Sequence, residues 1–246
     1  VNFSLHFMAL RGKLSAYWKS EEFVLYVLII LLATISIFIV RSVNTPNLIM
    51  STNFRDVLFQ VVSIITTTGF GTVDFAVWPP FCQVLLVALM FIGGCAGSTG
   101  GGIKVVRFLL FFKYARLQLH KLIHPRQIET IKLGKVKVPQ EVMIAILGFF
   151  AIYLAVFVLA SLLITMLGVD IVTGVTSVIA TLNNIGPGLN LVGPTQNFGH
   201  LPALAKLVLI FCMLAGRLEL YTIAILFSAS YWRMTRRPLF RWHTLP

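Results

Sequence analysis

The sequence predicts an all-α membrane protein built from two tandem repeats, each made of a transmembrane helix, a short helix, a glycine-containing turn and a second transmembrane helix. Of its 246 residues, 58% are hydrophobic and 11% are charged, which is unlike an ordinary soluble domain. Three runs contain no charged residue, namely 23–40, 75–103 and 142–169. About 20 apolar residues cross a bilayer as a helix, so each run can span. A fourth candidate, 201–232, is interrupted by Arg217 and Glu219.

The formal charge of +12 lies mainly beside the predicted spans. Nine of the lysines and arginines fall in residues 104–137, three in 1–22 and four in 233–246. Positive residues collect on the cytoplasmic side of membrane proteins. We therefore expect a cytoplasmic linker at 1–22, a cytoplasmic hairpin or linker at 124–140 and a cytoplasmic tail at 233–246. The glycine turns then open outward, and we expect no nucleic-acid partner.

The first predicted repeat covers 23–123. After its first span, Asn53 is the expected N-cap of a short helix, with Asp56 placed to reach back to it. The helix is expected over 54–66 and is about 20 Å long, so it enters the roughly 30 Å core and stops. Its C-terminal end directs partial negative charge at the turn 67–71, which favours a cation there. The alternative is a buried amphipathic helix that ends in an ordinary glycine cap.

A glycine-rich stretch interrupts the second span of this repeat. Trp78-Pro79-Pro80 starts a helix that runs to about Ile92, and six of the ten residues 93–102 are glycine. At about 1 kcal/mol each relative to alanine, these glycines cannot hold a regular helix. A helix resumes over 105–122 and ends at His124-Pro125. The stretch 93–104 is therefore an irregular loop at membrane depth or, as the alternative, a passive kink or a place of close helix packing.

The second predicted repeat covers 141–232 and follows a small β-hairpin at 128–138. Pro139 precedes the span 142–169, Asp170 is the expected N-cap of the second short helix, and Pro202 opens the last span. The order of elements is thus the same in both repeats.

The two glycine turns are the candidate functional elements. Superposing Gly69 on Gly186 pairs residues 67–71 with 184–188. Irregular backbone at membrane depth is tolerated only where protein buries it or where it lines a watery path. Turns of this kind offer carbonyls and hydroxyls that can replace the hydration shell of a monovalent cation, so we interpret them as ion-selectivity loops. Two turns cannot surround an ion, and the rest of the ring is expected from residues upstream of Val1 or, alternatively, from a second copy.

Arg217 is a charged residue in the middle of the last predicted span. A charge at that depth costs about 2.5–3.5 kcal/mol or more unless it is paired or hydrated. Glu219 lies two residues away and does not share its helix face, so we expect a partner elsewhere, with the loop 93–104 as the acceptor. We interpret Arg217 as an electrostatic latch on that loop; the alternative is a purely structural buried pair.

Three motifs together resemble the Trk/Ktr/HKT superfamily of potassium-uptake proteins, and within it the bacterial TrkH-type subunits. They are residues 66–71 with Val73-Asp74, residues 93–104 and residues 183–188. Such proteins have four repeats around one pore, and this chain resembles the third and fourth. The resemblance implies a potassium-channel-like fold, several spans of a bacterial inner membrane, and association with the N-terminal half of the same protein. It also implies a homodimer and a cytosolic RCK-type regulatory subunit that binds NAD or ATP.

The resemblance assigns roles to individual positions. The potassium filter would be formed by Thr67, Thr68, Gly69 and Phe70 in the first turn and by Asn184, Ile185, Gly186 and Pro187 in the second. The gate would be formed by Gly97, Ser98, Thr99, Gly100, Gly101, Gly102, Lys104 and Arg217. Potassium is the expected permeant ion, and a nucleotide acts only through the partner. Pro187 lacks the N–H that could tie the turn from behind, so the choice between potassium and sodium stays open.

We expect gated potassium uptake through a channel-like pore. The alternative is a proton- or sodium-coupled symporter, because broken helices also serve transporters, and a third class is a membrane adaptor that transports nothing. The basic residues of 104–137 and the tail fit either a regulatory subunit or anionic lipid. The sequence has no carboxylate pair, nucleophile triad or zinc-type cysteine–histidine spacing, so we predict that it is not an enzyme.

Overall fold

The computed structural model describes residues 1–46, 49–124, 130–134, 136–218 and 225. The predicted tail 233–246, Glu219 and most of the C-terminal half of the predicted span 201–232 therefore lie outside the described residues. The helices and strands are α1 (Phe3–Leu10), α2 (Ser15–Lys19), α3 (Glu21–Asn44), α4 (Met50–Ile65), α5 (Pro80–Met90), α6 (Val105–Ile123), β1 (Lys132–Leu133), β2 (Val136–Lys137), α7 (Gln140–Met166), α8 (Ile171–Leu182) and α9 (Ala203–Arg217). Short 3-10 turns lie at Phe75–Val77, Asn190–Val192 and Phe198–His200.

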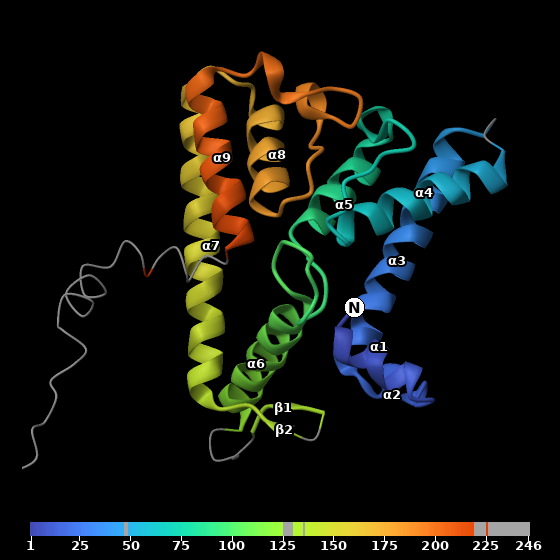
Figure 1. Cartoon of the computed structure of the whole chain (residues 1–246), viewed down its shortest axis with the longest axis vertical. Helices are drawn as coiled ribbons and strands as arrows, with labels where there is room; N and C mark the ends of the chain where they lie inside the picture. The colour runs from blue at the N-terminus through green and yellow to red at the C-terminus, as the bar shows by residue number, and fades with distance from the viewer. Residues whose placement is uncertain (47–48, 125–129, 135, 219–224, 226–246) are drawn as a thin grey trace, which may run out of the picture.

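Two groups of three helices repeat the same order along the chain (Figure 1). In the first group α3, α4 and α5 pack on one another, and in the second α7, α8 and α9 do so. Each group has its own apolar core, and α5 also contacts α8. Helix α6 packs against α7 and α3. Because each short helix packs against the other two helices of its group, the turns that follow α4 and α8 are held in place by the protein.

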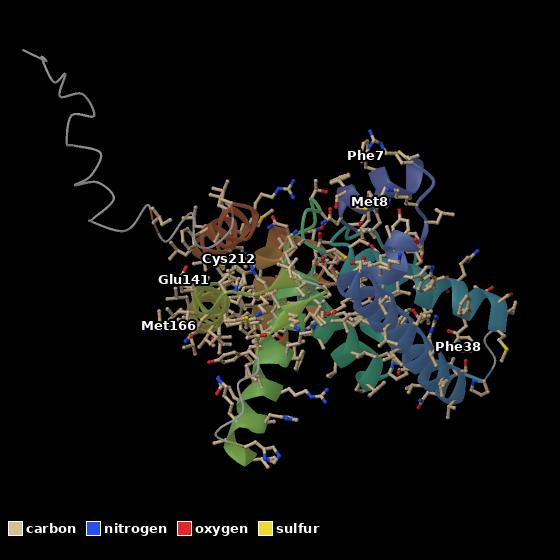
Figure 2. All side chains as sticks on the ribbon, turned by 90° about the horizontal axis from the view of Figure 1, so that it is seen from below. Phe7, Met8, Phe38, Glu141, Met166 and Cys212 are labelled. Atoms are coloured by element: carbon tan, nitrogen blue, oxygen red, sulfur yellow. The ribbon has the colours of Figure 1, made fainter. Side chains whose placement is uncertain are left out.

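Within the described residues, α3 and α7 are the helices long and apolar enough to cross a membrane. Figure 2 looks nearly along α7, so that Glu141 and Met166 at its two ends fall close together in the view. The predicted span 75–103 is not one continuous helix, because α5 ends at Met90 and the chain stays irregular until α6 starts at Val105. This agrees with the predicted glycine break.

The predicted start of the first short helix was wrong. Helix α4 begins at Met50, and its N-cap Ile49 makes no side-chain cap. Asn53 lies inside the helix, is 1% exposed and donates its amide to the Ser42 hydroxyl at 2.9 Å. Asp56 faces Arg41, with 3.8 Å between Nη1 and Oδ2. Both side chains contact residues of α3 instead of the backbone of α4, so neither caps the start of α4.

The predicted linker 1–22 contains helices that the sequence did not indicate, whereas the strands of the predicted hairpin are short. The linker folds into α1 and α2. Strands β1 and β2 pair antiparallel, with Lys132 opposite Lys137, and are shorter than the predicted 128–138. Phe7 and Met8 project from α1 away from the body of the protein in Figure 2.

Candidate ion-conduction site

The two short helices carry buried polar residues along their length. Helix α4 ends at Ile65 and α8 ends at Leu182, each directly before a glycine turn. The partial negative charge of a helix C-terminus therefore faces each turn. The buried polar residues of the two helices are Asn53, Asp56, Gln60, Ser63, Thr173, Thr176, Ser177 and Thr181.

The two turns have similar backbone geometry. Thr67 and Asn184 both have φ 55°, and Gly69 and Gly186 have φ 75° and 111°. In the first turn the N–H groups of residues 68 and 69 donate to the Ser63 carbonyl at 2.9 and 3.3 Å. In the second turn those of residues 185 and 186 donate to the corresponding carbonyl of α8, at residue 180, at 2.8 and 3.5 Å. Gly69 and Gly186 thus occupy equivalent positions in the two repeats, as the sequence predicted.

The two turns touch each other directly. A Cβ atom added at Gly69 would lie 1.8 Å from the carbonyl oxygen of Ile185 and 3.3 Å from Cδ of Pro187. Only glycine allows this approach, because any side chain would collide with the facing backbone. The carbonyl of Phe70 accepts a hydrogen bond from the Ser63 hydroxyl at 2.7 Å, while the Phe70 side chain is 70% exposed. The predicted filter residues of both repeats therefore lie together.

Side chains of the short helices support the turns from behind, which the sequence analysis missed. The amide of Gln60 donates to the carbonyl of Val73 at 3.3 Å. In the second repeat the N–H of Leu189 donates to the hydroxyl of Thr176 at 3.0 Å. Polar residues on otherwise apolar short helices were the available signal, because buried polar groups need partners.

The glycine-rich loop forms a flap whose two stems are joined. The N–H of Gly93 donates to the carbonyl of Ile103 at 2.9 Å, and residues 92 and 103 form a parallel bridge. The flap lies against both turns: the N–H of Gly101 donates to the Thr67 hydroxyl at 2.9 Å, and a Cβ at Gly101 would lie 2.1 Å from the carbonyl oxygen of Asn183. The loop is therefore packed against the candidate filter.

Two positively charged side chains donate hydrogen bonds to carbonyl groups of this loop. Arg217 donates from Nη1 to the carbonyl of Thr99 at 3.1 Å, and Thr99 belongs to the loop 93–104 that was the expected acceptor. The ammonium group of Lys104 donates to the carbonyl of Ser98 at 3.1 Å and also to that of Gly100. Positive charge thus lies on the loop side of the turns.

A cavity of about 370 Å³ brings the predicted gating residues together. All eight of them line it. Its other lining residues were not among the predicted gating residues and are Arg107, Phe149, Tyr153, Leu182 and Gly216. The Arg107 guanidinium lies over the Phe149 ring at 3.8 Å from the centroid, and the Tyr153 hydroxyl donates to Oδ1 of Asn183 at 2.9 Å. These residues come from separate elements, so no local motif marks them.

The site offers oxygen ligands of the kind that coordinate a monovalent cation. In the described part of the chain, no group of three or more histidine, cysteine and acidic side chains could hold a metal ion. The groups near the turns are instead carbonyls and hydroxyls, which coordinate hard monovalent cations.

The residues that form this site lie in a region that matches a known protein family. The TrkH family, described as a cation transport protein, matches residues 20–234. The chain belongs to the TrkH family. The matched region contains both turns, the glycine-rich loop and Arg217.

Individual TrkH proteins are similar along almost the whole chain. The Trk system potassium uptake protein TrkH of Salmonella typhimurium is 43% identical over 94% of this chain and 48% of that protein. That of Vibrio parahaemolyticus is 44% identical over 94% and 48%. The crystal structure of the potassium transporter TrkH from Vibrio parahaemolyticus matches with a TM-score of 0.87 and 44% identity, over 95% of this chain and 50% of that chain. The predicted all-α membrane fold and the TrkH-type resemblance are confirmed, and the chain spans about half the length of the relatives it matches.

Proposed function

We propose that this chain supplies two pore repeats of a protein that takes up potassium across a bacterial inner membrane. The relatives that it resembles are named potassium uptake proteins. The observation that carries the proposal is the contact between two turns of matching backbone geometry, with the glycine-rich loop packed against both. A transporter role also accords with the prediction that the chain is not an enzyme.

In this proposal the turns select the ion and the loop controls its passage. Carbonyls of residues 67–70 and 184–187 replace water around potassium, and the C-terminal ends of α4 and α8 favour its positive charge. The loop then blocks the path, and Arg217 and Lys104 add electrostatic repulsion. A potassium ion about 4 Å from a guanidinium would be disfavoured by about 4 kcal/mol at an effective dielectric constant of about 20.

The remaining pore repeats would come from the N-terminal half of the same protein. An apolar hollow of about 590 Å³ lies on α4 beside the first turn. Its lining residues are Phe54, Arg55, Leu58, Phe59, Val62, Ser63, Thr66, Thr68 and Phe70. Because the chain spans about half of its relatives, we propose that other repeats of the polypeptide cover this surface.

On the basis of the family resemblance, we also propose that the protein forms a homodimer and binds an RCK-type subunit on the cytosolic side, through which NAD or ATP would act. The exposed basic residues of α6 fit either that subunit or anionic lipid headgroups.

Uptake measurements with the intact protein in liposomes test the function. We expect rubidium and potassium flux that follows the potassium gradient, with a reversal potential independent of pH and sodium. A reversal potential that shifts with either gradient would indicate a coupled symporter, and no flux at all would indicate an adaptor.

The latch is tested by Arg217→Ala. Loss of a charge-assisted hydrogen bond of about 1.5–3 kcal/mol is expected to raise rubidium uptake in the switched-off state by at least about tenfold. Arg217→Lys is the control, because it keeps the positive charge. Unchanged switched-off uptake in Arg217→Ala would contradict the latch.

A further inference from the structure

Glu22 is a buried carboxylate at the start of α3, and neither the filter nor the latch uses it. It is 9% exposed, whereas its neighbour Glu21 lies at the surface and binds Lys113 and the N–H of Gly134. A buried carboxylate is costly unless hydrogen bonds or charges compensate it, so its partners indicate what it does.

Its partners lie on the two stems of the glycine-rich loop. The first stem is residues 92–97, where the chain enters the loop, and the second is residues 103–106, where it leaves the loop. Oε1 of Glu22 accepts a hydrogen bond from the N–H of Ala96 at 2.6 Å and another from the N–H of Val106 at 3.1 Å. Ala96 directly precedes Gly97, and Val106 is the second residue of α6. Every predicted gating residue of the loop lies between these two donors. One oxygen atom of Glu22 therefore joins residues 96 and 106, which lie on either side of the predicted gating residues of the loop.

The bond to Val106 also completes the start of α6. The first N–H groups of a helix have no partner within it, and the N-cap Lys104 provides no side-chain cap. A carboxylate at this end is also favoured by the helix dipole. Glu22 thus acts as a cap supplied by another helix, and removing it would leave two partly buried donors without this partner.

The other end of the segment 1–22 reaches the same stem. A Cβ at Gly97 would lie 3.2 Å from Oδ1 of Asn2, the residue that caps α1. Figure 1 shows the N-terminus beside the irregular chain between α5 and α6. Asn2 and Glu22 therefore both contact the first stem of the loop.

We propose that Glu22 is a positioning residue that fixes the stems of the gating loop, and that the segment 1–22 is thereby clamped to the gate. This inference rests on the proposed gating role of the loop. A displacement of α1 and α2 would then be transmitted directly to residues 96 and 97.

The chain contains its own probe for the test. Cys95 lies in the first stem and is 1% exposed, and Cys82 and Cys212 are fully buried in the two helix groups. The rate at which a thiol reagent alkylates each cysteine in the intact protein, read by mass spectrometry, separates loosening of the stem from general unfolding.

In Glu22→Ala we expect Cys95 to react at least about tenfold faster, because the neighbouring N–H of Ala96 loses its charged acceptor and one such hydrogen bond alone contributes about that factor to a local opening equilibrium. Cys82 and Cys212 should stay protected, and switched-off rubidium uptake should rise by a similar factor. Glu22→Gln keeps an oxygen acceptor and should restore most of the protection. Glu21→Ala is the matched control, because it removes the adjacent carboxylate without touching the loop.

Protection of Cys95 in Glu22→Ala equal to that in the unaltered protein would overturn the proposal. Should the alanine variant unfold and expose all three cysteines, Glu22→Asp decides, since its shorter side chain cannot reach both stems and should expose Cys95 alone. Faster reaction of Cys95 with no rubidium uptake in any variant, the unaltered protein included, would support the anchor and instead refute the proposed function.

Discussion

At the scale of single residues, the turns depend on backbone conformations that most side chains avoid. Thr67 and Asn184 both adopt the left-handed region, which costs about 1–3 kcal/mol and persists only where the surroundings impose it. The Thr67 hydroxyl accepts the N–H of Gly101, so the strained residue also contacts the loop. The same strain at equivalent positions of both repeats supports a functional role for the turns.

The two turn glycines should differ in their tolerance of a side chain. Gly69→Ala meets the facing carbonyl at 1.8 Å, whereas a Cβ at Gly186 meets nothing within 4 Å. Both substitutions strain a positive φ by about 1–2 kcal/mol, and Gly69→Ala adds roughly 1–3 kcal/mol of overpacking. We expect Gly69→Ala to abolish rubidium uptake and Gly186→Ala to retain part of it. Equal loss in both variants would mean that contact between the turns is not what requires glycine.

At the scale of elements, the two short helices start differently although they end alike. Asp170 caps α8 by accepting the N–H of Thr173 at 3.0 Å, and it also accepts the Asn190 amide at 3.2 Å. Asn53 holds the equivalent position of α4, because it lies as far before Gly69 as Asp170 lies before Gly186. There the helix continues for about one more turn toward its N-terminus.

The cap of α8 should make stability depend on pH. Hydrogen bonds from Thr173 hold the pKa of Asp170 below its usual value. A lowered pKa in the folded state means that this stabilisation is present above about pH 4 and is lost as the pH falls through the lowered pKa. Asp170→Ala should cost about 1 kcal/mol at pH 7, or roughly 2–4 °C in the thermal midpoint.

Thermal unfolding in detergent between pH 7 and pH 3 provides the measurement. Asp170→Asn is the control, since an asparagine cap does not titrate. The unaltered protein should lose stability relative to this variant only at the acidic end, and a constant difference across the range would argue against the cap.

At the scale of the whole molecule, the described fold leaves one side of the first turn open. The apolar hollow on α4 is continuous with the turn through Thr68 and Phe70. The second turn is likewise open at Gly186, where an added Cβ would meet nothing within 4 Å, while other residues of this turn pack against the first turn and the loop. The open side is where further pore repeats would complete the ring.

Phe59→Glu should disrupt that assembly. Phe59 lines the hollow and is 41% exposed in the described structure, so a carboxylate there would be buried by a neighbouring repeat at a cost of more than about 2 kcal/mol. We expect a smaller monodisperse fraction in size-exclusion chromatography and loss of uptake. Val136→Glu, at a 70% exposed position of β2, is the control. A Phe59→Glu protein that is as monodisperse and active as the unaltered one would exclude an internal interface here.

Much of the fold could be predicted because it rests on local chemistry. The apolar runs, Pro80 and Asp170 marked helices that the structure contains, and the glycines of 93–102 marked the break. The start of α4 could not be predicted from Asn53, since its partner is Ser42 on α3. Predicted gating residues lie together in one cavity, but Arg107 and Tyr153 were missed because they reach it from α6 and α7.

The sequence by itself determined which segments are apolar, where helices must stop and which two turns correspond, because these follow from side-chain solubility and from backbone preferences that act over a few residues. Only the tertiary structure decided that Gly69 meets Ile185, that Arg217 holds Thr99 and that Glu22 joins the two stems of the loop. Contacts between residues tens of positions apart depend on how helices pack, and no local pattern in the chain encodes that geometry.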